Sequence, residues 1–214
     1  FGEYVDGQRY LGLEKLTLLA HSFGPAIAAL YALEHPGRVE RMIFLGPIPP
    51  RKGTFFEDFG RALEARLSPE DAQRSEELAK RMNDGVDVVA SCREYWRLQT
   101  PPRLAKGVPL AVVKSDLCAA SEEAIQYGMA KTNPATFDSL GEWDWRERLK
   151  TVRAPVLIIY GVEDAIPLEQ VREWTALPNS RLLELEGAGH FPHAEKPDIV
   201  FPAIEEFLRE RTAK

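Results

Sequence analysis

The chain has 214 residues, of which 44% are hydrophobic, so it can bury a sizeable core in one domain, with or without an insertion. Its formal net charge of -6, from 27 basic and 33 acidic residues without a dense Lys/Arg block, argues against nucleic acid or an anionic membrane as partner. No apolar run is long enough for a membrane span or a signal peptide, so we expect a soluble, cytoplasmic protein.

The sequence holds two cysteines, Cys92 and Cys118. They could pair, but two free thiols are the expected state in a cytosolic protein. No C-x-x-C or His-rich spacing indicates a metal, and we expect neither a metal nor another cofactor.

The first part of the chain is predicted to form a β-α-β unit. Residues 1–10 have helical composition, and Gly12 can end that helix. An apolar strand follows at residues 16–19, and because both of its faces are apolar it is predicted to lie in the centre of a parallel sheet. A helix over residues 25–33 and a buried strand over residues 42–45 complete the unit.

The pattern then changes, because strand-like runs become scarce and charge-rich helical segments dominate. Helices are predicted at residues 55–66, 69–83, 86–98 and 121–129, the second with Ser68 as its N-cap. The run 108–113 is ambiguous between loop and strand. A helical block of this size is predicted to form a cap (lid) over one end of the sheet; a separate domain or plain helical packing would give the same pattern.

The sheet is expected to resume near the C-terminus. Residues 154–161 are apolar and rich in β-branched side chains, which predicts a strand. A helix at 168–177, a last strand at 181–185 and an amphipathic helix at 197–211 follow. The predicted domains are therefore a core over 1–50, a helical cap over 51–150 and a second part of the core over 151–214.

A serine stands directly after the first strand, in Ala20-His21-Ser22-Phe23-Gly24. A strand, a tight x-S-x-G turn and a helix form the context of a nucleophile elbow. Ala20 replaces the first glycine of the usual G-x-S-x-G with another small residue. The alternative is a surface serine that caps the following helix.

Asp164 and His190 each follow a later predicted strand. A serine hydroxyl needs a base to take its proton, and the base needs a third group that holds its tautomer. Since loops after parallel strands meet at one edge of the sheet, Ser22, Asp164 and His190 are predicted to form a catalytic triad. Glu163 and His193 are the neighbouring rivals for the acid and the base.

Three motifs carry a resemblance: Ala-His-Ser-Phe-Gly at 20–24, Val-Leu-Ile-Ile-Tyr-Gly-Val-Glu-Asp at 156–164 and Gly-Ala-Gly-His-Phe-Pro at 187–192. As a set they resemble the α/β-hydrolase superfamily. The helical segment and Gly-Glu-Trp-Asp-Trp at 141–145 resemble, more narrowly, the prolyl aminopeptidases (proline iminopeptidases). The resemblance implies an α/β fold, the α/β-hydrolase fold, in which a mostly parallel sheet is flanked by helices and carries an inserted helical cap.

In prolyl aminopeptidases, glutamates from the cap hold the free α-amine of the substrate. Residues 131–136, where one of them is expected, contain no carboxylate, which puts aminopeptidase activity in doubt. Glutamates elsewhere in the predicted cap are more typical of a solvated helix face. Tyr95 and Trp96 are candidates for lining an acyl or leaving-group pocket, although aromatic residues in a helix more often serve packing.

An acyl-transfer site also needs an oxyanion hole. One donor is expected to be the backbone N–H of Phe23, and the second comes from a loop after an earlier strand. The family has about four strands before the elbow strand, and this sequence has none. Because an apolar edge strand is unfavourable, we expect a separate or missing N-terminal segment to complete the sheet.

The motifs together predict a serine hydrolase that forms an acyl-enzyme on a small ester or a short peptide. Peptidase and carboxylesterase activity both remain open. The alternative is a non-catalytic binding protein with the same fold.

Overall fold

A parallel sheet forms the centre of the computed structural model, which describes residues 10 and 12–210. The expected helix at residues 1–10 falls, apart from residue 10, outside the described residues. The strands lie in the order β1, β2, β3, β4, and every pairing is parallel. Their bounds are Leu16–His21, Val39–Leu45, Val156–Gly161 and Ser180–Leu185.

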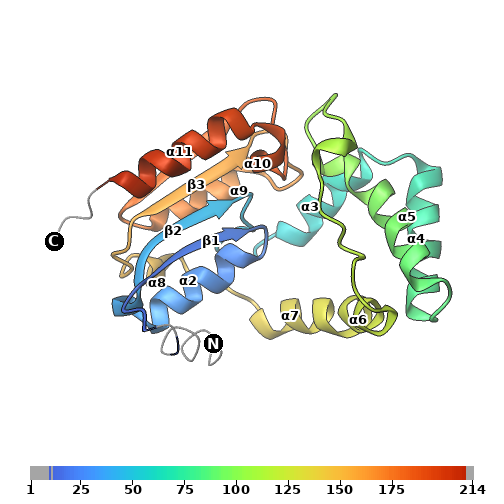
Figure 1. Ribbon diagram of the computed structural model, residues 1–214, viewed down its shortest axis with the longest axis horizontal. Coiled ribbons are helices and arrows are strands. Elements are labelled where there is room, and N and C mark those ends of the chain that lie inside the picture. The colour runs from blue at the N-terminus through green and yellow to red at the C-terminus, as the bar shows by residue number, and fades with distance from the viewer. Residues whose placement is uncertain (1–9, 11, 211–214) are drawn as a thin grey trace.

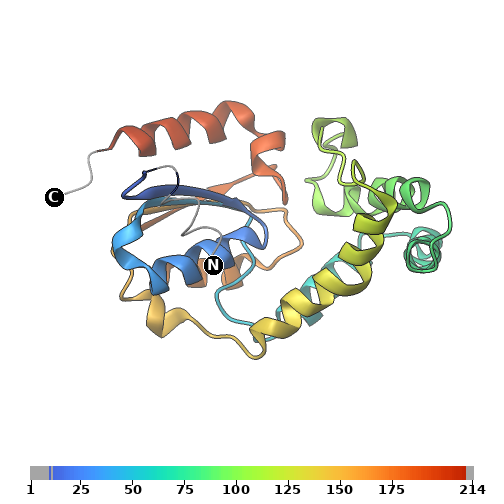
Figure 2. The ribbon, with the colours of Figure 1, turned by 60° about the horizontal axis from the view of Figure 1, so that its bottom comes forward.

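Helices cover both faces of the sheet (Figure 1, Figure 2). The helices α2 (Gly24–Glu34), α8 (Arg146–Leu149) and α9 (Leu168–Arg172) pack with Phe44 and Ile158 on one face. On the other face, α11 (Pro197–Arg209) packs over alternate residues of the same strands. The apolar runs of β2 and β3 are therefore buried on both sides, as the sequence predicts for central parallel strands.

The residues between β2 and β3 are mostly helical, and apart from α8 their helices lie to one side of the sheet (Figure 1). We call residues 51–150 the helical segment. Its other α-helices are α3 (Phe55–Glu64), α4 (Pro69–Asn83), α5 (Val88–Gln99), α6 (Glu122–Tyr127) and α7 (Asn133–Leu140).

The expected N-cap at Ser68 is confirmed, because its side chain accepts a hydrogen bond from the N–H of Asp71. The ambiguous run 108–113 forms a 3₁₀ turn at Leu110–Val112. The sequence analysis did not predict α7, which follows α6 through the π-helical turn Gly128–Thr132 and carries Pro134 in its first turn, where proline is tolerated. No helix among the described residues is long and apolar enough to cross a membrane.

The sequence predicts that β1 belongs in the centre of a complete sheet, although it predicts no strand before β1. In the described part of the chain, β1 pairs with β2 alone and lies at the sheet edge. The residue Leu19 is 57% exposed. The helix α11 packs over β2 and β3 and leaves β1 partly open.

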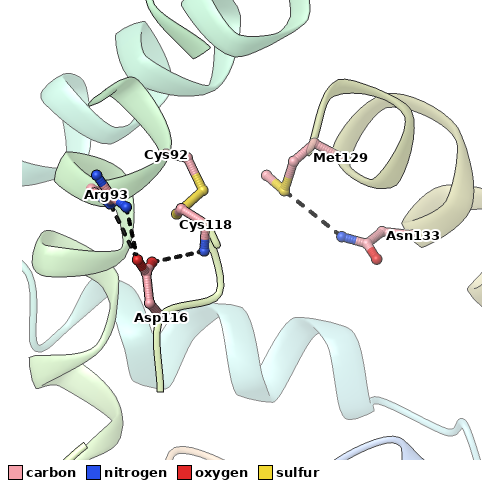
Figure 3. The surroundings of a disulfide bond; sticks show 6 residues. All are labelled: Cys92, Arg93, Asp116, Cys118, Met129 and Asn133. Atoms are coloured by element: carbon pink, nitrogen blue, oxygen red, sulfur yellow. Dashed lines mark hydrogen bonds and ion pairs between the residues drawn. A yellow bond between two sulfur atoms is a disulfide. The ribbon is translucent and has the colours of Figure 1, made fainter. Parts of the chain in front are cut away.

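The expectation of two free thiols is wrong, because Cys92 of α5 and Cys118 form a disulfide bond (Figure 3). Their Cα atoms lie 5.9 Å apart, within the range that a disulfide bridges. Asp116 supports the bonded loop: it accepts hydrogen bonds from the N–H of Cys118 and from the guanidinium of Arg93. Composition and the expected compartment could not reveal this proximity.

Reduction of this disulfide is expected to lower the free energy of unfolding by about 3 kcal/mol, because the bond closes a loop between residues 26 apart in the sequence. Urea denaturation with and without a phosphine reductant measures the change. The double variant Cys92→Ser/Cys118→Ser is the control and should not respond to reductant. Equal midpoints for the oxidised and reduced wild type would contradict the prediction.

Candidate active site

Ser22 occupies a sharp turn between β1 and α2. Its φ of 60° lies in the left-handed region, which a non-glycine residue adopts at a cost that neighbouring contacts must offset. Two hydrogen bonds provide those contacts, from the Ser22 N–H to the Leu45 carbonyl and from the Ile48 N–H to the Ser22 carbonyl, both 3.0 Å long. A Cβ at Gly24 would stand 3.2 Å from the Cβ of Ala20, so the elbow needs small residues at both positions.

The structure brings the three predicted triad residues together. The Nε2 atom of His190 lies 3.0 Å from the Ser22 hydroxyl oxygen, and its Nδ1 atom lies 2.8 Å from an Asp164 carboxylate oxygen. Asp164 and His190 are only 6% and 7% exposed. When Nδ1–H donates to Asp164, Nε2 is free to accept the hydroxyl proton. Phe23, not Ser22, is the N-cap residue of α2, so the helix-cap alternative does not describe Ser22.

Glu163 and His193, the alternative candidates for the acid and the base, lie in other surroundings than Asp164 and His190. The Glu163 carboxylate accepts a hydrogen bond from the Lys106 N–H instead of contacting His190. His193 does not face Asp164; its buried Nδ1 atom has no hydrogen-bond partner among the described residues. Burial and then the charge of His190 lower the pKa of His193.

His21, next to Ser22, is a further imidazole at the site. Its Nε2–H donates to the His190 carbonyl at 2.8 Å. Burial, followed by the charge of His190, lowers the pKa of His21 to about 4, so His21 is neutral at pH 7. No group of three or more His, Cys, Asp or Glu side chains in the described residues could hold a metal ion.

One carboxylate holds the loop that carries His190. Glu195 accepts hydrogen bonds from the N–H groups of Gly189 at 3.0 Å and Phe191 at 3.0 Å, which flank the imidazole residue. It also accepts the N–H of Ala105 at 2.8 Å and so joins this loop to the helical segment. The sequence analysis missed Glu195, because only the folded loop distinguishes it from an exposed helix-end glutamate.

The loop that carries Asp164 is also joined to the helical segment. The Arg66 guanidinium donates to the carbonyls of Glu163 at 2.7 Å and Asp164 at 3.3 Å. The His190 N–H donates to the Arg103 carbonyl at 2.8 Å. The helical segment therefore holds the backbone at both Asp164 and His190. No local sequence signal indicates Arg66.

A cavity of about 660 Å³ opens beside His21 and Phe191, between the sheet edge and the helical segment. His21 and Phe191 line it from the core, and Trp96 lines it from α5. Of the two aromatic candidates, only Trp96 is among the lining residues; Tyr95 packs edge-on against it, with ring centroids 5.4 Å apart. The ring of Phe23 packs against Phe137 of α7, and within the described part of the chain its N–H donates to no other group.

The family model of the alpha/beta hydrolase fold matches residues 3–197 of this sequence. The chain belongs to the α/β-hydrolase family. The prediction of the α/β-hydrolase fold is thereby confirmed, and solved structures of α/β hydrolases agree with it. For example, this α/β hydrolase resembles the crystal structure of proline iminopeptidase from Mycobacterium smegmatis with a TM-score of 0.62, at 22% identity, over 96% of this chain and 69% of that one.

Curated relatives include hydrolases with several names. A protein of Haemophilus influenzae, provisionally assigned as an esterase/lipase, is 25% identical over 94% of this chain and 62% of its own length. A pimeloyl-[acyl-carrier protein] methyl ester esterase of Aromatoleum aromaticum is 27% identical over 88% of this chain and 72% of its own. A proline iminopeptidase of Heyndrickxia coagulans is 25% identical over 96% and 71%. The chain thus spans about two thirds of the length of these relatives.

Glu195→Gln is expected to slow the reaction of Ser22 with a fluorophosphonate by about tenfold or more. The substitution puts an NH2 group in place of one of the two carboxylate oxygens that accept hydrogen bonds from the His190 loop. Labelling reactions quenched at successive times measure the rate constant of fluorophosphonate labelling. Glu186→Gln, an exposed glutamate before the same loop, is the matched control and should keep the wild-type rate. A wild-type rate in Glu195→Gln would show that this carboxylate does not position the base.

Proposed function

We propose that the protein is a serine hydrolase that works through an acyl-enzyme on Ser22. The observation that carries this proposal is the contact between Ser22, whose backbone is in the left-handed region, and His190. His190 is within hydrogen-bond distance of both Ser22 and the buried Asp164. The names of the relatives support hydrolase chemistry in general. Because the chain spans 62% of the Haemophilus influenzae relative, the activity of the whole protein is part of the proposal.

In the proposed reaction, the Ser22 oxygen attacks the substrate carbonyl carbon while His190 Nε2 takes the hydroxyl proton. Asp164 stabilises the resulting imidazolium, and the N–H of Phe23 donates to the oxyanion. The tetrahedral intermediate collapses, and the leaving group departs with the proton from His190. A water molecule then gives a proton to His190 and attacks the acyl carbon. When this second tetrahedral intermediate collapses, His190 returns the proton to the Ser22 oxygen, and the acid is released.

We favour an ester over a peptide with a free amine. Recognition of an ammonium group requires an available carboxylate, but Glu94 of α5 is engaged by Arg74 at 2.8 and 2.9 Å. Glu122 and Glu123 are exposed in the first turn of α6.

We also interpret residues 51–150 as a cap over the site, with Trp96 as the aromatic residue that lines the substrate cavity.

We further propose that another segment completes the site beside β1. Leu19 borders both the large cavity and a second apolar cavity of about 180 Å³ between β1 and α2. An exposed strand edge that borders two apolar cavities favours the binding of an additional strand and the residues that flank it. The loop after such a strand would reach the carboxyl edge of the sheet, where a second oxyanion donor is needed near Phe23.

The triad proposal predicts that a fluorophosphonate labels wild-type protein at Ser22 and that Ser22→Ala abolishes the labelling. His190→Ala should slow labelling by about 1,000-fold or more while the circular dichroism spectrum is retained. Ser139→Ala, an exposed serine of α7, is the control. Wild-type rates in either triad variant would refute that residue's role, and no labelling of the intact protein would favour the non-catalytic alternative.

The second-segment proposal predicts that the isolated 24.1 kDa chain reacts about 100 to 1,000 times more slowly than the protein purified from its source, because one oxyanion donor is missing. Intact mass spectrometry of the source protein should show a longer chain or a bound companion chain. A source protein of 24.1 kDa with no companion and equal activity would overturn the proposal.

A further inference from the structure

One wall of the cavity beside His21 and Phe191 is a loop of the helical segment. We call residues 113–118 the cavity loop; it follows the 3₁₀ turn Leu110–Val112 and has irregular backbone. The cavity loop residues that line the cavity are Val113, Ser115, Asp116, Leu117 and Cys118. The helix α5 continues this wall through Trp96. The position of the cavity loop therefore sets the width of the cavity.

The cavity loop is attached to α5 mainly through Cys118 (Figure 3). Residues 114–117 are exposed, whereas Cys118 is 2% exposed and bonded to Cys92. Within the described part of the chain, the backbone of the cavity loop makes hydrogen bonds only with residues 110–119. Asp116 also pairs with Arg93 at 3.0 Å, but both side chains are largely exposed, so the pair contributes little. The disulfide is therefore the main contact that fixes the loop.

Leu117 stands directly before the bonded cysteine and lines the cavity although it is 59% exposed. A single exposed leucine needs no explanation, but this one belongs to a set of apolar side chains that line the same cavity. The others nearest in the chain or across the cavity are Leu110, Val113, Trp96 and Phe191. Leu117 thus adds apolar surface to a cavity wall and not to an isolated surface position.

The chemistry of the cavity favours an apolar ligand. Its volume of about 660 Å³ falls within the range of about 300–1,000 Å³ that is typical of small-ligand sites. Arg93 and Asp116 pair with each other, and His21 is neutral at pH 7. Arg97 is exposed to solvent. An alkyl chain that packs against Leu117 would remove apolar surface of both from water, which is favourable.

We propose that the Cys92–Cys118 disulfide holds Leu117 in the cavity wall as a specificity-determining residue, so that the preferred substrates are esters of medium- or long-chain fatty acids. This inference rests on the proposed hydrolase function of Ser22. The ester carbonyl would lie at Ser22, and its acyl chain would enter the cavity past His21, the residue before Ser22. Without the disulfide, the cavity loop loses its covalent attachment, and Leu117 loses its fixed position beside the chain.

The test compares p-nitrophenyl octanoate with p-nitrophenyl acetate as substrates of the full-length protein, because these esters share a leaving group and differ only in the acyl chain. In Leu117→Ala, kcat/KM for the octanoate should fall by about fivefold or more, mainly through KM, since the removed carbon atoms contacted the chain. The value for the acetate should stay within about twofold. Leu117→Met, which keeps the apolar volume, should retain octanoate hydrolysis within about twofold.

The role of the disulfide is tested with the same two esters. The variant Cys92→Ser/Cys118→Ser should lose kcat/KM for the octanoate to the same extent as Leu117→Ala and should retain the circular dichroism spectrum. Because both changes remove one contact, adding Leu117→Ala to this variant should cause a further loss of less than about twofold. Losses that multiply would show that the disulfide and Leu117 act independently, which would overturn the proposal. Leu117→Ala keeps the disulfide, so it tests the cavity wall even where the serine variant does not fold.

Leu208→Ala is the matched control, because Leu208 is an exposed leucine of α11 that lies outside the lining of this cavity. It should keep kcat/KM for both esters within about twofold, as surface substitutions usually do. Equal losses on both esters in Leu117→Ala, or no loss on the octanoate, would overturn the proposal. A wild type that prefers the acetate would also overturn it.

Two further measurements separate this inference from the proposed hydrolase function. A short-chain fluorophosphonate should label Ser22 of Leu117→Ala at the wild-type rate, which shows that the triad is intact. If the wild type cleaves neither ester and is not labelled, the hydrolase proposal fails. Titration calorimetry with octanamide then tests Leu117 directly: a dissociation constant that Leu117→Ala raises by about fivefold or more supports the cavity wall, and no binding to wild type refutes it.

Discussion

The parallel register of the sheet is the constraint on which the site depends. His21 pairs with Leu45, and Gly161 pairs with Leu185, so these strands end at one edge of the sheet. The chain leaves that edge at Ser22, at Asp164 and in the loop before His190. Residues 168 positions apart can therefore form a hydrogen bond without any local sequence relation. An antiparallel strand in the same place would direct its following loop to the opposite edge.

The helical segment contributes to the site through backbone contacts as well as through the cavity that it borders. Glu195 joins the His190 loop to Ala105, and Arg66 holds the carbonyl of Asp164. A carboxylate that accepts three N–H groups is a strong acceptor, because its charge assists each bond. Movement of this segment would consequently shift Asp164 and His190 relative to Ser22. The disulfide joins α5 to Cys118 within the segment.

Charge is distributed unevenly around the cavity. Arg93, Arg97 and Asp116 line it from the helical segment, whereas His21 lines it from the core and is neutral at pH 7, because burial and then the charge of His190 lower its pKa to about 4. The Glu94 carboxylate is paired with Arg74. Under the proposed function, this pairing and the absence of carboxylates from residues 131–136 both count against a substrate with a free amine.

The sequence by itself determined the strands, most helices and the family, because apolar periodicity and the elbow motif are local properties of the chain. It also identified Ser22, Asp164 and His190 as candidates that lie after strands. Only the tertiary structure decided that Cys92 meets Cys118. The contacts of Glu195 are equally non-local, since the N–H groups that a carboxylate accepts depend on which distant segments pack together.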